Sequence, residues 1–155
     1  MTSFTRGTRR LGGAAAAVLA LGLAPGAASA SEPVKLRFQK DCPVLECTGY
    51  LLTPAGKPIP GSIVTTTTTP VWAPEGGDFF HYSAVETIAA REGTIEMRLV
   101  GILDFGAEPD VTSVIGTVES GSWRGRPLAG AAITAQATRV FGTTFRGVVR
   151  IRPAR

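Results

Sequence analysis

The chain has 155 residues and a formal net charge of +4, with a pI near 9.6. That length suits one small domain, and a hydrophobic content of 44% is too high for an intrinsically disordered chain. The basic pI suggests a nucleic-acid partner only if the basic residues belong to the folded domain.

The first 30 residues have the pattern of a secretory signal peptide. Three arginines precede an uncharged run of Leu, Ala, Gly and Val over residues 11–24, and Ala28 and Ala30 form an A-x-A cleavage site. A transmembrane anchor is the alternative, but the run is shorter than the roughly 20 apolar residues that a membrane span needs. We therefore expect cleavage after Ala30, secretion of a single domain over residues 31–155, and no membrane span.

Two export routes stay open. Arg9 and Arg10 resemble a twin-arginine signal, although Gly12 stands where a bulky apolar residue is usual, and the general secretory route is the alternative. Cleavage removes three of the 16 basic residues and none of the 12 acidic ones, which leaves a net charge of +1. The case for a nucleic-acid partner is then weak, and we expect none.

The rest of the chain alternates apolar and polar residues in short segments, which is typical of β-strands. In the first segment, Val34, Leu36 and Phe38 alternate with Lys35 and Arg37. Further strands are expected over residues 48–52, 63–69, 79–89, 95–103, 111–119, 131–140 and 145–151.

These segments predict an all-β fold. About eight strands with Gly- and Pro-rich turns suit a small antiparallel closed barrel of the up-and-down type, and a β-sandwich is the alternative. The alanines near residues 129–137 are the strongest helical signal, but Ile133, Thr134 and the flanking glycines favour a strand. Glycines within predicted strands mark bends and favour the barrel; they are Gly49, Gly101, Gly116, Gly130 and Gly147.

Cys42 and Cys47 are the only cysteines. In an exported protein, two cysteines this close most simply form one disulfide. A redox role would normally use C-x-x-C, and a zinc site would need more ligands than the single histidine offers.

The second half of the chain resembles the bacterial allene oxide cyclase-like proteins. The resemblance covers roughly residues 79–152 and is carried by GTVESGSW at 116–123, LAGAAI at 128–133 and GTTFRG at 142–147. It implies a small eight-stranded barrel, similar in shape to lipocalins and dirigent proteins. Family members that are enzymes bind an apolar substrate in the barrel and guide a cyclisation, assisted in the plant cyclases by an acidic residue and a held water. No position here can be assigned to that acid from the motifs.

Two residues are weak catalytic candidates. Glu86 lies in an otherwise apolar or small strand, where an inward carboxylate would act as a general acid or base; a solvent-facing side chain is the plainer interpretation. His81, the only histidine, suits an acid–base role at a pocket mouth, or is simply a strand histidine at the surface.

Aromatic residues are candidates for ligand binding. Tyr82 shares its strand face with Glu86, and Trp72 and Trp123 flank turns, where they either hold a ligand at a barrel mouth or plug the barrel ends. Asp104, Glu108 and Asp110 cluster in one loop, but their spacing matches no calcium motif, so we expect no metal and no cofactor.

Charge is unevenly distributed in the mature chain. Residues 31–119 contain all 12 acidic residues, whereas residues 120–155 contain arginines and no acid. Cross-strand pairing with the acidic strands explains this without a partner. The alternative is an anionic cell-surface polymer bound through Arg146, Arg150 and Arg152.

Together these features predict a secreted bacterial β-barrel that acts as a binding or structural module able to hold a small apolar ligand. An enzyme, a metal-independent cyclase or isomerase of the allene oxide cyclase-like type, is the alternative.

Overall fold

The computed structural model describes residues 32–154. This part of the chain contains no helix, so no helical membrane span is found in it. The predicted signal peptide and its cleavage site at Ala28 and Ala30 lie outside the described residues. The strands are β1 (Val34–Asp41), β2 (Glu46–Leu52), β3 (Ile63–Trp72), β4 (Phe79–Ala90), β5 (Gly93–Asp104), β6 (Val111–Trp123), β7 (Arg126–Pro127), β8 (Ala132–Phe141) and β9 (Thr144–Arg152).

The strands follow from the alternation of the sequence. In β5, Ile95, Met97 and Leu99 point into the molecule and are almost fully buried, whereas Glu96 and Arg98 between them are exposed. Successive side chains of a strand point to opposite faces, so one face of each strand supplies the core and the other meets solvent.

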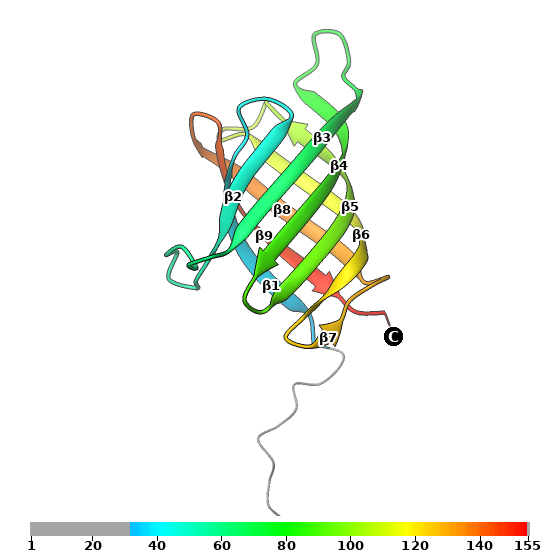
Figure 1. Ribbon diagram of the computed structural model, residues 1–155. Coiled ribbons are helices and arrows are strands. Elements are labelled where there is room, and N and C mark those ends of the chain that lie inside the picture. The colour runs from blue at the N-terminus through cyan, green and yellow to red at the C-terminus, as the bar shows by residue number, and fades with distance from the viewer. Residues whose placement is uncertain (1–31, 155) are drawn as a thin grey trace, which may run out of the picture.

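The strands form a closed antiparallel barrel (Figure 1). The order is β5-β4-β3-β2-β1-β9-β8-β6, and pairing of β5 with β6 closes it. Strands β1 and β9, from the two ends of the domain, pair along their length from Val34 with Ile151 to Asp41 with Thr144. The predicted eight-stranded barrel is therefore confirmed, and the sandwich is wrong. The extra strand, β7, only extends a hairpin at the end of β6.

Strand bounds differ from the predicted ones at several places, such as β6, which runs to Trp123 and not to residue 119. Two local differences have a clear physical reason. The predicted strand ends at residue 69, before Pro70, whereas β3 continues to Trp72. Proline is tolerated there because pairing of β3 with β2 ends at Thr67, so the missing N–H of Pro70 breaks no ladder on that side. Gly130 lies not in a strand but in the turn before β8, with a φ of +79° that suits glycine.

The two ends of the barrel differ. At the end that contains the β4–β5 turn, Ile88, Ile95 and Ile151 fill the interior, and Trp123 and Leu128 cover it; all five side chains are buried. Four connections surround the other end: β1–β2, β3–β4, β5–β6 and β8–β9 (Figure 1). The interior is hollow at that end.

Candidate functional site

The hollow end contains a cavity of about 420 Å³. This volume lies within the range of roughly 300–1,000 Å³ that is typical of small-molecule sites. The wall is mostly apolar and includes Phe38, Leu99, Leu103, Val114 and Phe145. Such a wall favours an apolar ligand, because burial of apolar surface is the main source of binding free energy.

The cavity exists because the inward-facing side chains are small at this end of two strands. Ala84 of β4 and both Ala135 and Ala137 of β8 line it. At the packed end the same strands carry Ile88 and Ile133 instead, which are buried in the core. The change from isoleucine to alanine along each strand leaves space that no protein atom fills.

Lys40 of β1 and Glu86 of β4 form an ion pair inside the barrel. Lys40 Nζ lies 2.5 Å from Glu86 Oε2, and the two side chains are 12% and 3% exposed. The Thr66 hydroxyl of β3 accepts a hydrogen bond from Lys40 at 2.8 Å and donates one to Glu86 Oε2 at 2.8 Å. Buried charges are tolerated when they are paired and hydrogen-bonded, and this Lys40–Thr66–Glu86 network meets both conditions.

The network corrects and extends the sequence interpretation. Glu86 points into the cavity and not to solvent, so the plainer interpretation of this residue is wrong. Lys40 and Thr66 were not singled out from the sequence. The signal was present for Lys40, which continues the inward alternation of Leu36 and Phe38.

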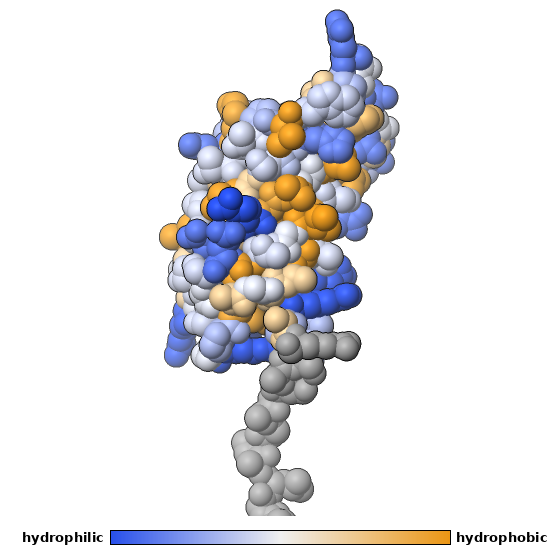
Figure 2. Space-filling model, turned by 90° about the vertical axis from the view of Figure 1, so that its right-hand side faces the viewer, coloured by the Kyte–Doolittle hydropathy of each residue, from blue (hydrophilic) through white to orange (hydrophobic). Residues whose placement is uncertain are grey.

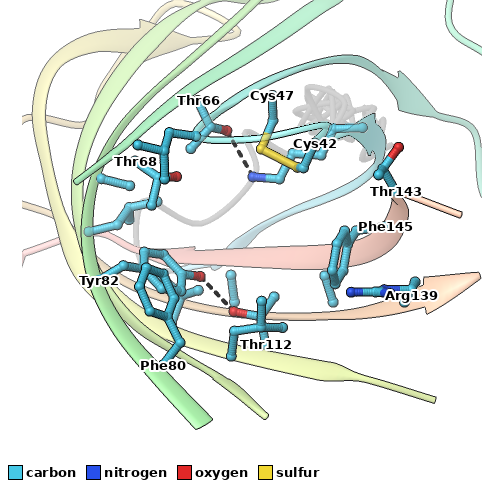
Figure 3. A pocket seen from close by; sticks show the side chains of 18 of the residues that line it. Cys42, Cys47, Thr66, Thr68, Phe80, Tyr82, Thr112, Arg139, Thr143 and Phe145 are labelled. Carbon is cyan, nitrogen blue, oxygen red and sulfur yellow. Dashed lines mark hydrogen bonds between the residues drawn. A yellow bond between two sulfur atoms is a disulfide. The ribbon is translucent and has the colours of Figure 1, made fainter. Parts of the chain in front are cut away.

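Tyr82 of β4 also faces the cavity, stacked on Phe80 (Figure 3). Its hydroxyl lies 2.6 Å from Thr112 Oγ1 of β6. The ring covers Gly101, where an added Cβ would come within 2.4 Å of Tyr82 Cζ, so only glycine leaves room for it. Burial raises the pKa of Tyr82 and the negative charge of Glu86 raises it further, although the Thr112 hydrogen bond lowers it. Tyr82 is therefore a neutral phenol at neutral pH.

A disulfide and a stacked arginine lie at the cavity mouth. Cys42, directly after β1, is bonded to Cys47 of β2, as predicted (Figure 3). Arg139 of β8 lies over the Phe145 ring, 5.6 Å from its centre, and its Nη2 lies 2.7 Å from Asp110 Oδ2. Both features fix elements that border the opening.

The structure does not bring the other site candidates to the cavity. Trp72 and His81 pack together at a ring distance of 5.5 Å but are not among the lining residues, and Trp72 is 54% exposed. Trp123 is buried at the opposite, packed end, which agrees with a plugging role. Of the candidate residues for catalysis and ligand binding, only Glu86 and Tyr82 line the cavity.

The acidic loop has partners within the protein. Asp104 Oδ1 accepts hydrogen bonds from the amides of Gly106 and Ala107 at 2.8 and 3.2 Å, and Asp110 pairs with Arg139. Within residues 32–154, no three His, Cys, Asp or Glu side chains come close enough together to hold a metal ion.

The outer surface has two further features. Figure 2 shows apolar residues on the face of the barrel that it presents. Among the exposed apolar residues, Val100 of β5 pairs with Ile115 of β6. On β9, Arg150 lies opposite Lys35 of β1, and Arg146 hydrogen-bonds to the uncharged side chain of Gln39.

The predicted pairing of the C-terminal arginines with acids therefore holds only in part. Arg139 has a carboxylate partner, Asp110. In the described part of the chain, Arg146, Arg150 and Arg152 have no carboxylate within ion-pair distance, and Glu119 pairs with Arg98 of the acidic segment instead.

Comparisons of the chain with protein-family models, with curated proteins and with solved structures found no match. The resemblance to allene oxide cyclase-like proteins stays a prediction from the sequence motifs.

Proposed function

We propose that this protein is exported and that its barrel binds a small, largely apolar molecule in the cavity. One observation carries the proposal: the inward residues change from large to small along the strands, and the space that results has a buried polar network on an otherwise apolar wall. Apolar walls with a few placed polar groups are the usual composition of a ligand pocket.

Folding alone does not account for the cavity. An unfilled apolar space loses packing contacts and so reduces the stability of the empty barrel. The buried ion pair adds little net stability to compensate, because its attraction mainly offsets its own desolvation cost. A ligand that fills the space restores those contacts. The proposal needs no metal and no cofactor.

Blocking the cavity tests this function. Ala135→Phe places a large side chain on the cavity wall, and Ala132→Phe makes the same change at an exposed position of the same strand. We expect the neutral dye Nile red to bind the unmodified protein and Ala132→Phe, and to bind Ala135→Phe at least about tenfold more weakly, since overpacking removes the site. Equal binding by the two variants would show that the dye binds elsewhere, and would contradict the proposal that the cavity is the binding site.

A second candidate function is cyclisation or isomerisation of an apolar substrate inside the barrel. The specific observation is that Glu86 is 2% exposed and faces an apolar cavity beside Tyr82. Such a carboxylate can act on a substrate as a general base or stabilise a developing positive charge.

Product analysis tests the catalytic alternative. With an allene oxide, the substrate class that the family resemblance implies, the enzyme should yield one enantiomer of the cyclic product, and Glu86→Gln should yield the racemate. A racemic product at the buffer rate from the unmodified protein would exclude this activity.

The basic outer face supports a third proposal, binding of an anionic cell-surface polymer through Arg146, Arg150 and Arg152. Like charges directly opposite each other on a sheet are unfavourable, and the cross-strand pair of Lys35 and Arg150 is of this kind. An anionic polymer would relieve the repulsion.

A charge-matched comparison tests the polymer. Arg150→Gln/Arg152→Gln should weaken binding to dextran sulfate at low salt, whereas Lys57→Gln/Arg98→Gln, with the same loss of charge elsewhere on the surface, should not. Equal weakening by both variants would show only a general effect of net charge.

A further inference from the structure

The charges that line the cavity are balanced. Among the described lining residues, the charged ones are Lys40, Glu86 and Arg139. Lys40 is paired with Glu86, and Arg139 is paired with Asp110 at 2.7 Å. Each of these charges already has a counter-charge among the described residues, although Arg139 Nε is a buried donor without a hydrogen-bond partner. A charged ligand entering this cavity would lose its hydration and would compete with these ion pairs.

Lys40 nevertheless has one hydrogen-bond donor to offer. An ammonium group has three N–H donors, and two of them are directed to Thr66 Oγ1 and Glu86 Oε2. The Thr66 hydroxyl uses its own proton for Glu86. The third Lys40 donor is left for an acceptor that enters the cavity.

The same network disfavours a carboxylate as that acceptor. An acceptor bound at Lys40 Nζ lies close to Glu86, since the two side chains are in contact. Two carboxylates in one poorly solvated site repel each other and cannot both stay ionised without cost. A ketone, ester or hydroxyl oxygen accepts the same hydrogen bond and brings no second negative charge.

The other residues that line the cavity are consistent with an uncharged ligand. Tyr82 has a raised pKa because it is buried, so it stays a neutral phenol at neutral pH. Its hydroxyl and that of Thr112 are already hydrogen-bonded to each other (Figure 3). The remaining wall is largely apolar.

We infer that the ligand is an uncharged, mostly apolar molecule with one oxygen acceptor that binds Lys40 Nζ, and that the Lys40–Glu86 pair selects it against the corresponding carboxylate. This inference rests on the proposed binding function. It adds the chemical class of the ligand and names Glu86 as the residue that determines specificity.

Two probes of nearly equal shape test the inference. 2-Undecanone and decanoate share the same acyl chain and differ in a methyl group against a carboxylate oxygen. In competition with Nile red at neutral pH, the ketone should bind the unmodified protein at least about tenfold more tightly than decanoate.

Variants identify the residues responsible. Glu86→Gln removes the negative charge with little change of shape, so decanoate should gain at least about tenfold in affinity relative to the ketone. Lys40→Met removes the donor and should weaken the ketone about tenfold. Lys35→Met, the same substitution on the outer face of β1, is the control and should change neither affinity.

The outcomes distinguish failure of the inferred ligand class from failure of cavity binding itself. If decanoate binds the unmodified protein as tightly as the ketone, or if the ketone does not displace the dye, the inference is wrong and cavity binding stands. If the dye itself does not bind, the proposed function fails and the inference fails with it. The comparison of 2-undecanone with decanoate needs only the unmodified protein, so it tests the inference even if a variant misfolds.

Discussion

Lys40 and Glu86 are opposite charges held inside a barrel whose other interior residues are mostly apolar. Removing a charge from water is costly, and mutual attraction offsets that cost only while both partners are present. The pair therefore contributes little net stability, but the loss of either partner leaves the other without compensation. Removing one partner should therefore cost more stability than removing both, and this difference can be measured.

Lys40→Met should destabilise the protein by about 3 kcal/mol, because Glu86 loses its counter-charge in a buried site. Lys40→Met/Glu86→Leu should recover most of that loss, since no charge is left buried. Chemical unfolding measures both values, with Lys35→Met as a surface control expected to stay within about 0.5 kcal/mol. A double variant as unstable as Lys40→Met would contradict the account.

Tyr82 should make stability depend on alkaline pH. Its folded pKa is raised above the usual value by burial, so the folded state holds the phenol proton more tightly than the unfolded state. Its contribution is complete below about pH 10, the unfolded pKa, and is lost as the pH rises above it. Between about pH 9 and pH 11, the unmodified protein should lose more unfolding free energy than Tyr82→Phe; equal losses would show that Tyr82 is not perturbed.

At the scale of elements, three strands that are separate in sequence build the site. Strand β1 supplies Lys40, β3 supplies Thr66 and β4 supplies Glu86. The β1–β2 connection closes over the same end of the barrel and is held by the Cys42–Cys47 disulfide. The strands fix the network, and the connections define the entrance.

The disulfide should stabilise the domain modestly because it closes a short loop. Cys42→Ala/Cys47→Ala should lower the unfolding free energy by about 2 kcal/mol. Thermal unfolding of the oxidised protein, the reduced protein and the variant checks this. The reduced protein should match the variant, and three equal melting temperatures would show that the crosslink does not constrain the unfolded chain.

The strands could be predicted from the sequence because alternation is a local pattern, as in Ile95, Met97 and Leu99 of β5. The polar network could not. Lys40 and Glu86 are 46 residues apart, and their contact depends on the register of three strand pairs and on barrel closure. Alternation predicts that Lys40 and Glu86 both lie on the inner faces of their strands. Which inner side chains come into contact depends on the closed barrel.

At the scale of the whole molecule, the basic pI says little about the binding site of the folded domain. Three of the 16 basic residues lie in the predicted signal peptide. Seven of the other 13 basic residues lie after residue 119, where no acidic residue offsets them. One of these, Arg150, lies on the outer face opposite Lys35. The cavity, in contrast, is lined by paired charges.

Export should release the domain with a defined N-terminus. Intact-mass measurement of protein from the culture medium should give a chain that begins at Ser31, with the cysteines oxidised. A cell-associated product that retains Ala28 and Ala30 would contradict the predicted cleavage.

The central claim is that the cavity holds a ligand, and native mass spectrometry of the exported protein tests it most directly. The account predicts a species heavier than the oxidised chain by one small molecule, which is released on denaturation and absent from Ala135→Phe. A single species at the mass of the chain alone, from protein that also fails to bind Nile red, would contradict it.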